Sequence, residues 1–441
     1  MNTKTKTKTE REAHAKTPLV ITAGKIFDDG KVIELIRSPG GKGPYLLVWD
    51  GKRATTGHSI ECWGSVYGAP DLAPSLARAM RLPPGIKDYS SARSLFAEIT
   101  DLFQKHLDLP GQESGLLATF TIGTWMADSL PTAPSLAISG STEEGIDALR
   151  LLNCVCRHAL TLAEITPSGL RSLPMEVGLT LLVNQQELRP NLQRLFRASS
   201  FRGLNLFGNR GRLVDLYGAK AVLYENDAAV DTFSGGVIQI SLLSSRLRSS
   251  ALGEQALNEI ADRFQPRLLM YRLRNVGKAP ATEVDVSTFT SGSQQLARSI
   301  AMCFPEDSVL ARDAVQLLLP QDEEIRGRCF CDVNYVIIEI LLAIAREGKQ
   351  RAVQVDELAK DVSTLLTNRG EAFRYSPEQI GWRLRNLNIR RHSSSSGREI
   401  LLNKDTKENL QRSARAYGLA CGQTDPTNVL DDNPTKVIAP K

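Results

Sequence analysis

Short apolar segments with the character of β-strands alternate with segments of helical periodicity through the middle of the chain. The strand candidates are 135–139, 179–183, 203–207, 214–223 and 237–242, and the helices between them are 146–158 and 190–198. Strands separated by helices at this spacing are typical of a sheet with parallel members. The sequence therefore predicts an α/β fold for this part of the protein.

The rest of the 441 residues divides into segments of different character, and this length allows about three domains. Residues 1–17 are expected to be a disordered basic tail, because a Lys-Thr repeat without an apolar face cannot form a core. Residues 18–85 alternate β-prone runs with turn signals and predict a small β-rich module. Residues 86–325 are assigned to the α/β domain with its helical lead-in and lid, and residues 421–441 to a second disordered tail.

Residues 326–420 have an element order of their own. The predicted elements are helix 333–347, strand 353–355, helices 356–368 and 376–387, and strands 389–392 and 399–402. Helix, strand, helix, helix, hairpin is the order of a winged helix-turn-helix, so we expect that domain here.

The composition excludes several classes of protein. With 42% hydrophobic and 23% charged residues, the chain is neither globally disordered nor fibrous. Its longest apolar run, 336–345, is interrupted by Glu339 and is too short for a bilayer core of ~30 Å. No apolar segment follows the N-terminal repeat as a signal peptide would require. We therefore expect a cytoplasmic protein without a membrane partner.

The cysteines are few and odd in number. Seven in so long a chain favour reduced thiols over disulfides. Cys154 and Cys156 lie in a helical pattern where their side chains would face different directions, and no histidine has ligand-like spacing to another. We expect buried thiols and no metal site.

A glycine pair marks the turn from the first predicted strand of the α/β region into a helix. Gly140 and Gly145 are five residues apart, the frame of a loop that wraps a phosphate at a helix N-terminus. Ile146 occupies the position of the phosphate-binding lysine, and Asp147 that of the magnesium ligand. The frame could also be a coincidental turn, with Ser141 in its middle.

The charges and a second strand end bear on the same loop. Glu143, Glu144 and Asp147 would repel a nucleotide, because like charges at 4 Å cost ~4 kcal/mol at an effective dielectric of 20. These carboxylates could instead cap the helix. Strand 179–183 ends in Asn184-Gln185, where P-loop ATPases carry an acidic pair that binds metal and activates water. Amides perform neither task well.

These motifs resemble a known family. The segments 124–125, 134–140, 149–152 and 180–188 are similar to the ATPase core of bacterial, phage and plasmid helicases of the primase-helicase type, within the AAA+ group of P-loop ATPases. The resemblance covers roughly residues 101–274, and 377–387 is similar to the helix that closes such proteins.

The resemblance implies a AAA+-type sheet core and a nucleotide site in which four of six functional positions are changed. The six positions are Gly140, Gly145, Ile146, Asp147, Asn184 and Gln185. We interpret the domain as a pseudo-ATPase with degenerate Walker A and B motifs, no catalytic residue and no cofactor. Binding of ATP and magnesium without hydrolysis remains the milder alternative.

Two basic islands carry most of the charge asymmetry of a chain with net charge +5. In 376–387, Gln379, Arg383 and Asn386 share one helix face with side chains suited to base edges. The predicted wing carries Arg390, Arg391 and Arg398 for phosphate contacts. Arg202, Arg210 and Arg212 flank strand 203–207, and by the resemblance a hairpin here lines a nucleic-acid channel. Solvated surface, lid packing or a subunit interface are the alternative roles.

The sequence thus predicts a catalytically inactive, helicase-like protein that binds DNA through its C-terminal winged helix. A replication or mobile-element setting, homo-oligomerisation and an active ATPase partner are possible accompaniments. The alternatives are an ATPase with substituted motifs and a protein-protein adaptor.

Overall fold

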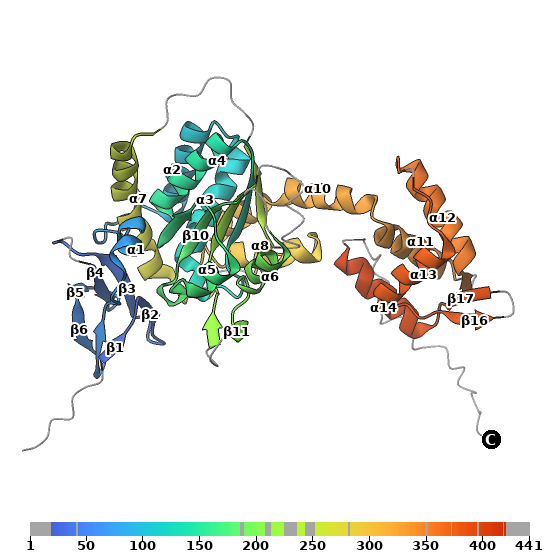
Figure 1. The fold of residues 1–441 in the computed structure, drawn as a ribbon, viewed down its shortest axis with the longest axis horizontal. Coiled ribbons are helices and arrows are strands. Elements are labelled where there is room, and N and C mark those ends of the chain that lie inside the picture. Colours follow the sequence, from blue (N-terminus) through green and yellow to red (C-terminus); the bar gives the residue numbers. More distant parts are fainter. Residues whose placement is uncertain are drawn as a thin grey trace, which may run out of the picture. The chain divides into compact units, whose positions relative to one another are not determined.

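The structure, a computed structural model, falls into two units. It describes residues 19–40, 43–185, 189–207, 213–224, 236–242, 252–280, 283–348, 352–371, 373–394, 397–417 and 419. The first unit extends to Val286 and adds Ser293–Leu319, and the second comprises Ser287–Gly292 and the chain from Pro320 onward (Figure 1). Both predicted tails, 1–17 and 421–441, lie outside the described residues.

A five-stranded parallel sheet organises the first unit. In chain order its strands are β8 (Ser135–Ser139), β9 (Ala159–Leu162), β10 (Thr180–Asn184), β13 (Lys220–Tyr224) and β14 (Ile238–Ser241). In space they are ordered β14-β8-β13-β10-β9, and every neighbouring pair is parallel. The predicted α/β fold with a parallel sheet is confirmed.

Two strand predictions differ from the structure. Strand β9 was not predicted, because four residues are too few to show a periodic pattern. The predicted strand 214–223 is two strands, β12 (Leu213–Asp215) and β13, because residues 216–219 between them are not in a strand. Strand β12 pairs with β11 (Asn205–Phe207) as an antiparallel hairpin instead of joining the sheet.

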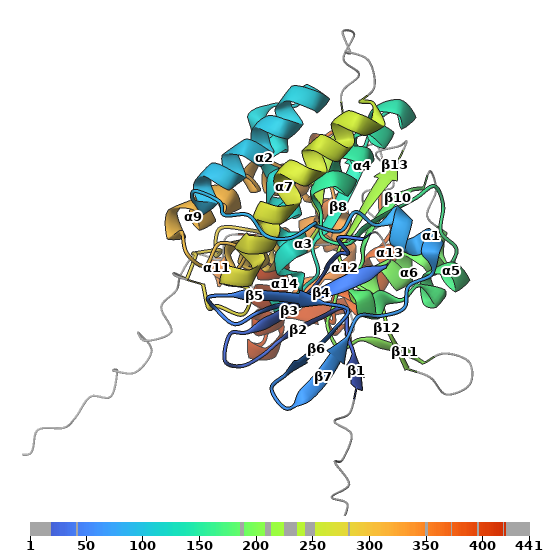
Figure 2. The same ribbon diagram turned by 90° about the vertical axis from the view of Figure 1, so that its left-hand side faces the viewer.

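Helices cover both faces of the parallel sheet. They are α2 (Ala92–Leu107), α3 (Gly111–Met126), η1 (Ala127–Ser129), α4 (Thr142–Val155), α5 (Pro167–Ser172), η2 (Met175–Val177), α6 (Pro190–Ala198), α7 (Glu254–Asn275), α8 (Ser291–Ala301) and α9 (Ser308–Gln316). Helices α2, α4 and α7 pack side by side (Figure 2). Alternate residues of β13 face opposite ways, so Val222 packs with Phe196 of α6 while Leu223 meets α4. Among the described helices, none has both the length and the apolar composition needed to cross a bilayer.

The N-terminal segment forms two small sheets. One is antiparallel, with β2 (Gly24–Ile26), β3 (Val32–Arg37), β4 (Pro44–Trp49) and β5 (Ala54–Gly57) in that order. The other has β1 (Leu19–Ile21) parallel to β7 (Ser65–Gly68), which pairs antiparallel with β6 (Ser59–Cys62). Helix α1 (Pro74–Ala79) follows.

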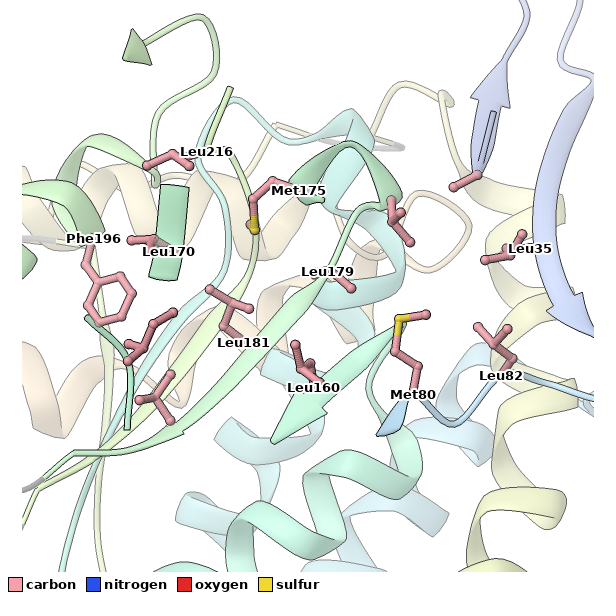
Figure 3. Close-up of a cluster of buried hydrophobic side chains, with 14 of the residues drawn as sticks. Leu35, Met80, Leu82, Leu160, Leu170, Met175, Leu179, Leu181, Phe196 and Leu216 are labelled. Carbon is pink, nitrogen blue, oxygen red and sulfur yellow. The ribbon is translucent and has the colours of Figure 1, made fainter. Parts of the chain in front are cut away.

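This β-rich module shares its core with the parallel sheet. Leu35 of β3 belongs to the same buried cluster as Leu160 of β9 and Leu181 of β10 (Figure 3). Met80 and Leu82, in the chain after α1, also join it. The module is therefore part of the first unit and not a separately packed domain.

A buried ionic cluster also joins the module to the core. Glu34 of β3 is fully buried, and its Oε1 accepts from Arg157 Nη2 at 3.0 Å and lies 3.1 Å from His158 Nε2. Arg272 of α7 binds the other Glu34 oxygen and also Asp128 of η1. Removing one member of this cluster would leave a buried charge without a partner, which is costly. The cluster therefore holds together β3, η1 and α7, three elements that are distant in sequence.

The second unit has its own core and the predicted order of elements. They are α11 (Val333–Glu347), β15 (Ala352–Gln354), α12 (Val355–Asn368), α13 (Pro377–Asn386), β16 (His392–Ser394) and β17 (Gly397–Leu401), followed by α14 (Lys404–Ala416), which was not predicted. The strands form an antiparallel sheet in the order β15-β17-β16. Helix α10 (Leu319–Phe330) leads into this unit.

Candidate functional site

The predicted phosphate loop lies at the carboxyl edge of the parallel sheet, where α/β proteins bind their ligands. Strand β8 ends at Ser139 and α4 begins at Thr142, so only Gly140 and Ser141 connect them. Gly145 lies inside the helix, and its amide donates to Ser141 O at 2.9 Å. The structure thus differs from the predicted loop frame, because the backbone that would wrap a phosphate forms the first helical turn.

A serine cap begins this helix. Ser141 Oγ accepts from the Glu144 amide at 3.4 Å and donates to Glu144 Oε2 at 2.8 Å. The N-cap residue is Ser141, and Glu144 is buried beside it in the first turn of the helix. Ser-x-x-Glu before a helix is the capping-box signature, and this signal in the sequence could have placed the helix start.

Packing explains both glycines. Gly140 has φ of 154°, and a Cβ built on it would lie 2.8 Å from Leu242 Cβ, in the chain just after β14. A Cβ on Gly145 would overlap the side chain of Leu223 on β13. The pair lets α4 and the end of β14 approach the sheet closely, which requires no ligand.

The other loop positions have no nucleotide chemistry either. Ile146 is 39% exposed on α4, and Asp147 Oδ1 lies 3.8 Å from Arg150 Nη1. Without a lysine at this position, neither side chain supplies the positive charge that a triphosphate needs.

Of the amide pair at the end of β10, Gln185 makes structural hydrogen bonds. Gln185 is 9% exposed, and its Oε1 accepts from the Ile165 amide at 3.2 Å. The backbone amide of Gln185 donates to the backbone oxygen of Leu223 on β13 at 3.3 Å. Gln185 therefore fixes the chain beyond β9 against the sheet edge, while Asn184 is half-buried at the end of β10. These residues do not fit a magnesium-nucleotide complex.

The cysteine prediction concerns metal binding. Over the described ranges, no group of three or more His, Cys, Asp or Glu side chains is arranged to hold a metal ion. Burial raises the pKa of Cys154 to about 11 and that of Cys156 to about 12. Both thiols are therefore protonated at neutral pH, whereas a zinc ligand is a thiolate.

One exposed face of α13 gathers four side chains. Gln379, Trp382, Arg383 and Asn386 follow the spacing i, i+3, i+4, i+7, while Ile380 and Leu384 on the other side are fully buried. Three of the four were predicted from the sequence; Trp382 was not, although the same helical spacing predicts it. Trp382 is 55% exposed.

Gln379 was predicted to contact a base, but in the structure it also caps its own helix. Its side-chain Oε1 accepts from the backbone amide of Ser376 at 2.9 Å, and its backbone amide donates to Ser376 Oγ at 3.3 Å. This reciprocal capping box starts α13. A bidentate bond to adenine needs both the oxygen and the nitrogen of the side-chain amide to point at the base, whereas this oxygen points at the Ser376 backbone amide.

Five arginines on or near α13 have no side-chain hydrogen bond and no ion pair among the described residues. They are Arg383, Arg385, Arg390, Arg391 and Arg398. Arg383 lies over the Trp382 ring, and the charge of Arg398 helps to lower the pKa of Glu378, after the larger effect of a hydrogen bond from Ser376. By contrast, Arg263 and Arg267 in the first unit both bind Glu98.

The third predicted group is divided. Arg202 is exposed, but its Nη2 donates to Ala127 O at 3.1 Å and Asp128 O at 2.8 Å. Its guanidinium carbon also lies 4.4 Å from the centre of the Tyr217 ring. These contacts hold Arg202 against the end of η1. Arg210 and Arg212 lie outside the described residues, in the part of the chain between β11 and β12. The β11–β12 hairpin itself extends from the first unit (Figure 1).

No protein-family model matches the chain, and no curated protein matches it. Several solved structures are similar to it, including the following three. The apo A form of the NrS-1 C-terminal region is 12% identical, covers 84% of this chain and 97% of its own, and has a TM-score of 0.35. A full-length MCM homolog from Methanopyrus kandleri is 11% identical, covers 66% of this chain and 77% of its own, and has a TM-score of 0.30. Cdc6p from Pyrobaculum aerophilum is 12% identical, covers 73% of this chain and 97% of its own, and has a TM-score of 0.20.

Likenesses of this strength do not establish a family or a function. The strands themselves define the class, an α/β protein with a parallel five-stranded sheet. A second unit of helices and a three-stranded antiparallel sheet is joined to it.

Proposed function

We propose that this protein binds nucleic acid through its second unit, acting as a winged helix-turn-helix, and that its α/β core is a P-loop-like scaffold without ATPase chemistry. The observation that carries the proposal is the set of five unpaired arginines around α13. Arg385, Arg390 and Arg398 are exposed, Arg383 and Arg391 are half-buried, and none of the five forms an ion pair with a described residue. Their charge is therefore available to phosphates, which supply much of the affinity of DNA-binding proteins.

The element order supports this assignment of roles. Helix α13 follows α12 as the recognition helix would, with Arg383 and Asn386 available to base edges. The β16–β17 hairpin stands where a wing would be, and Arg390, Arg391 and Arg398 accompany it as phosphate contacts. Asn386 replaces Gln379 as the amide available for a base, because Gln379 caps the helix.

The core is proposed to be catalytically inactive. The chain-order positions of its strands run 5-1-4-3-2 across the sheet, which supports the P-loop scaffold that the resemblance implies. The helix start at Thr142 and the engaged amide of Gln185 argue against a nucleotide at the edge of that sheet. A place in replication or in a mobile element, beside an active ATPase or another copy, belongs to the same proposal.

The salt dependence of DNA binding tests the arginine set. We expect the full chain to bind duplex DNA with a steep negative log–log salt slope, and Arg390→Gln and Arg398→Gln each to lessen that slope by ~0.9. Fluorescence anisotropy at several salt concentrations measures it. The matched control is Arg274→Gln, since Arg274 is an exposed arginine of the first unit already paired with Asp88. Equal slopes in all four proteins would contradict the proposal.

ATP turnover tests the core. We expect no magnesium-dependent hydrolysis by the purified chain and no rise in melting temperature on adding Mg·ATP, because no side chain replaces the missing lysine or acidic pair. Turnover that disappears in Asn184→Ala would sink this part of the proposal. Gly145 variants are unsuitable for this assay, because they disturb the packing of α4 on β13.

A further inference from the structure

The second unit has an aromatic pocket beside the proposed DNA-binding face. The pocket has a volume of ≈ 390 Å³ and is lined by Phe373, Tyr375, Gln379, Trp382 and Arg383. Trp382 is 55% exposed and Phe373 is 54% exposed. Two large aromatic rings that are exposed to water side by side indicate a binding surface, because folded proteins rarely leave such groups exposed without a function.

The exposure of Trp382 is unusual for this chain. Trp125 is 1% exposed, Trp49 is 8% exposed and Trp63 is 37% exposed. Trp49 and Trp125 are core residues, and Trp63 packs against Phe27 with 4.2 Å between ring centres. The Trp382 ring is covered in part by the guanidinium of Arg383, 5.2 Å from its centre. The rest of the indole is free to stack on another flat group.

The walls of the pocket are fixed before anything binds. Phe373 and Tyr375 meet edge to face with ring centres 4.8 Å apart. The Tyr375 amide donates to Ser363 Oγ on α12 at 3.1 Å, which anchors this connection between the helices. Trp382 and Arg383 stand on α13, whose start is held by the capping box. A preformed site binds a flat ligand without first ordering its own side chains.

The polar groups of the pocket include several hydrogen-bond donors. Gln379 Oε1 accepts from the backbone amide of Ser376, which orients the side chain and leaves its Nε2 free to donate to a ligand. Arg383 adds donors that cannot be deprotonated, and no carboxylate lines the pocket. Donors beside a stacking surface suit the edge of a nucleobase, since every base carries ring or carbonyl acceptors.

We propose that this pocket binds one unpaired nucleobase, stacked on Trp382, so that the second unit recognises DNA carrying a single-stranded segment. The inference rests on the proposed nucleic-acid binding and specifies its substrate. Charge complementarity favours a nucleic-acid strand over an apolar protein segment, because Arg390, Arg391 and Arg398 also carry unpaired charges in this unit. Stacking tolerates any sequence, so the preference concerns strandedness and not a particular base.

The test compares two DNA molecules in the full-length protein. One is a blunt duplex, and the other is the same duplex with a short single-stranded overhang. We expect the wild type to favour the overhang about 5- to 150-fold, the range that stacking one base on an aromatic ring gives. In Trp382→Ala this ratio falls to about one, and in Trp382→Phe most of it remains because a ring is kept.

Tryptophan fluorescence provides an independent readout. The overhang should quench the emission of the wild type and of Trp63→Phe, but not that of Trp382→Phe, which still binds it. Trp382 is half exposed, so its replacement is expected to leave the melting temperature nearly unchanged, and circular dichroism checks this.

The outcomes separate the two proposals. Equal affinity for both DNA molecules, or a ratio that survives in Trp382→Ala, overturns the base pocket while the arginine-dependent duplex binding stands. Failure to bind either DNA molecule overturns both. A ratio lost only in Trp382→Ala supports the pocket.

Discussion

At the scale of single residues, the parallel sheet contains a buried lysine. Lys220 on β13 is 1% exposed, and its Nζ donates to Gly218 O at 3.3 Å. Burial lowers the pKa of Lys220 to about 7 from its ordinary value of 10.5. In this pH range the unfolded lysine binds a proton that the folded one does not, so the free energy of unfolding rises with pH between these values.

We therefore expect Lys220→Met to stabilise the protein at neutral pH. A similar apolar volume replaces a group that resists charging, so the free energy of unfolding should increase by about 1–3 kcal/mol. The rise in stability between about pH 7 and about pH 10 should also become smaller. Urea denaturation of both proteins at these two pH values measures the effect, and a less stable variant at pH 7 would refute it.

At the scale of elements, the contact between α4 and β13 depends on Gly145. A methyl group there overlaps Leu223, so Gly145→Ala should destabilise the protein by about 1–3 kcal/mol. Leu223→Ala in the same chain should offset part of that cost, because it makes room for the methyl group. Chemical denaturation of the single and double variants measures the coupling.

A second helical glycine provides the control. Gly327 of α10 has no atom within 4 Å of a built Cβ. Gly327→Ala should therefore be neutral or stabilise the protein by up to about 1 kcal/mol. A loss of stability equal to that of Gly145→Ala would mean that packing on Leu223 is not the cause.

At the scale of the whole molecule, each unit has its own buried cluster, and we expect two unfolding transitions. Glu34→Gln leaves the buried Arg157 and Arg272 undercompensated, so it should cost about 3–5 kcal/mol in the transition of the first unit. Leu358→Ala, in the other cluster, should lower only the second transition, by about 2–5 kcal/mol. Differential scanning calorimetry resolves the two.

The Glu34 effect should depend on pH in a defined direction. Burial acts to raise the pKa of Glu34, but Arg157 and Arg272 outweigh it and hold the pKa well below the ordinary value of 4.5. Its stabilisation is present above pH 4.5 and is lost as pH falls through the depressed value. The difference between wild type and Glu34→Gln should therefore shrink only in strong acid. A control, Glu98→Gln, removes a partly exposed partner and should cost at most about 1 kcal/mol.

The sequence by itself determined the local elements and their order. Periodicity and caps such as Ser376 act within one turn of the chain, so α6, α12 and α13 were predictable to within one or two residues. The alternation of strand and helix also predicted the parallel sheet, although β9 was too short to show a pattern.

Only the tertiary structure decided what the site residues do. Gly140 and Gly145 have the same spacing in a phosphate loop and in a helix start, and contact with Leu242 and Leu223 distinguishes the two. Likewise, an arginine in the sequence does not show whether a carboxylate from a distant segment lies beside it, as Glu34 does beside Arg157. Pairing and burial depend on contacts between segments far apart in the chain, which local pattern does not contain.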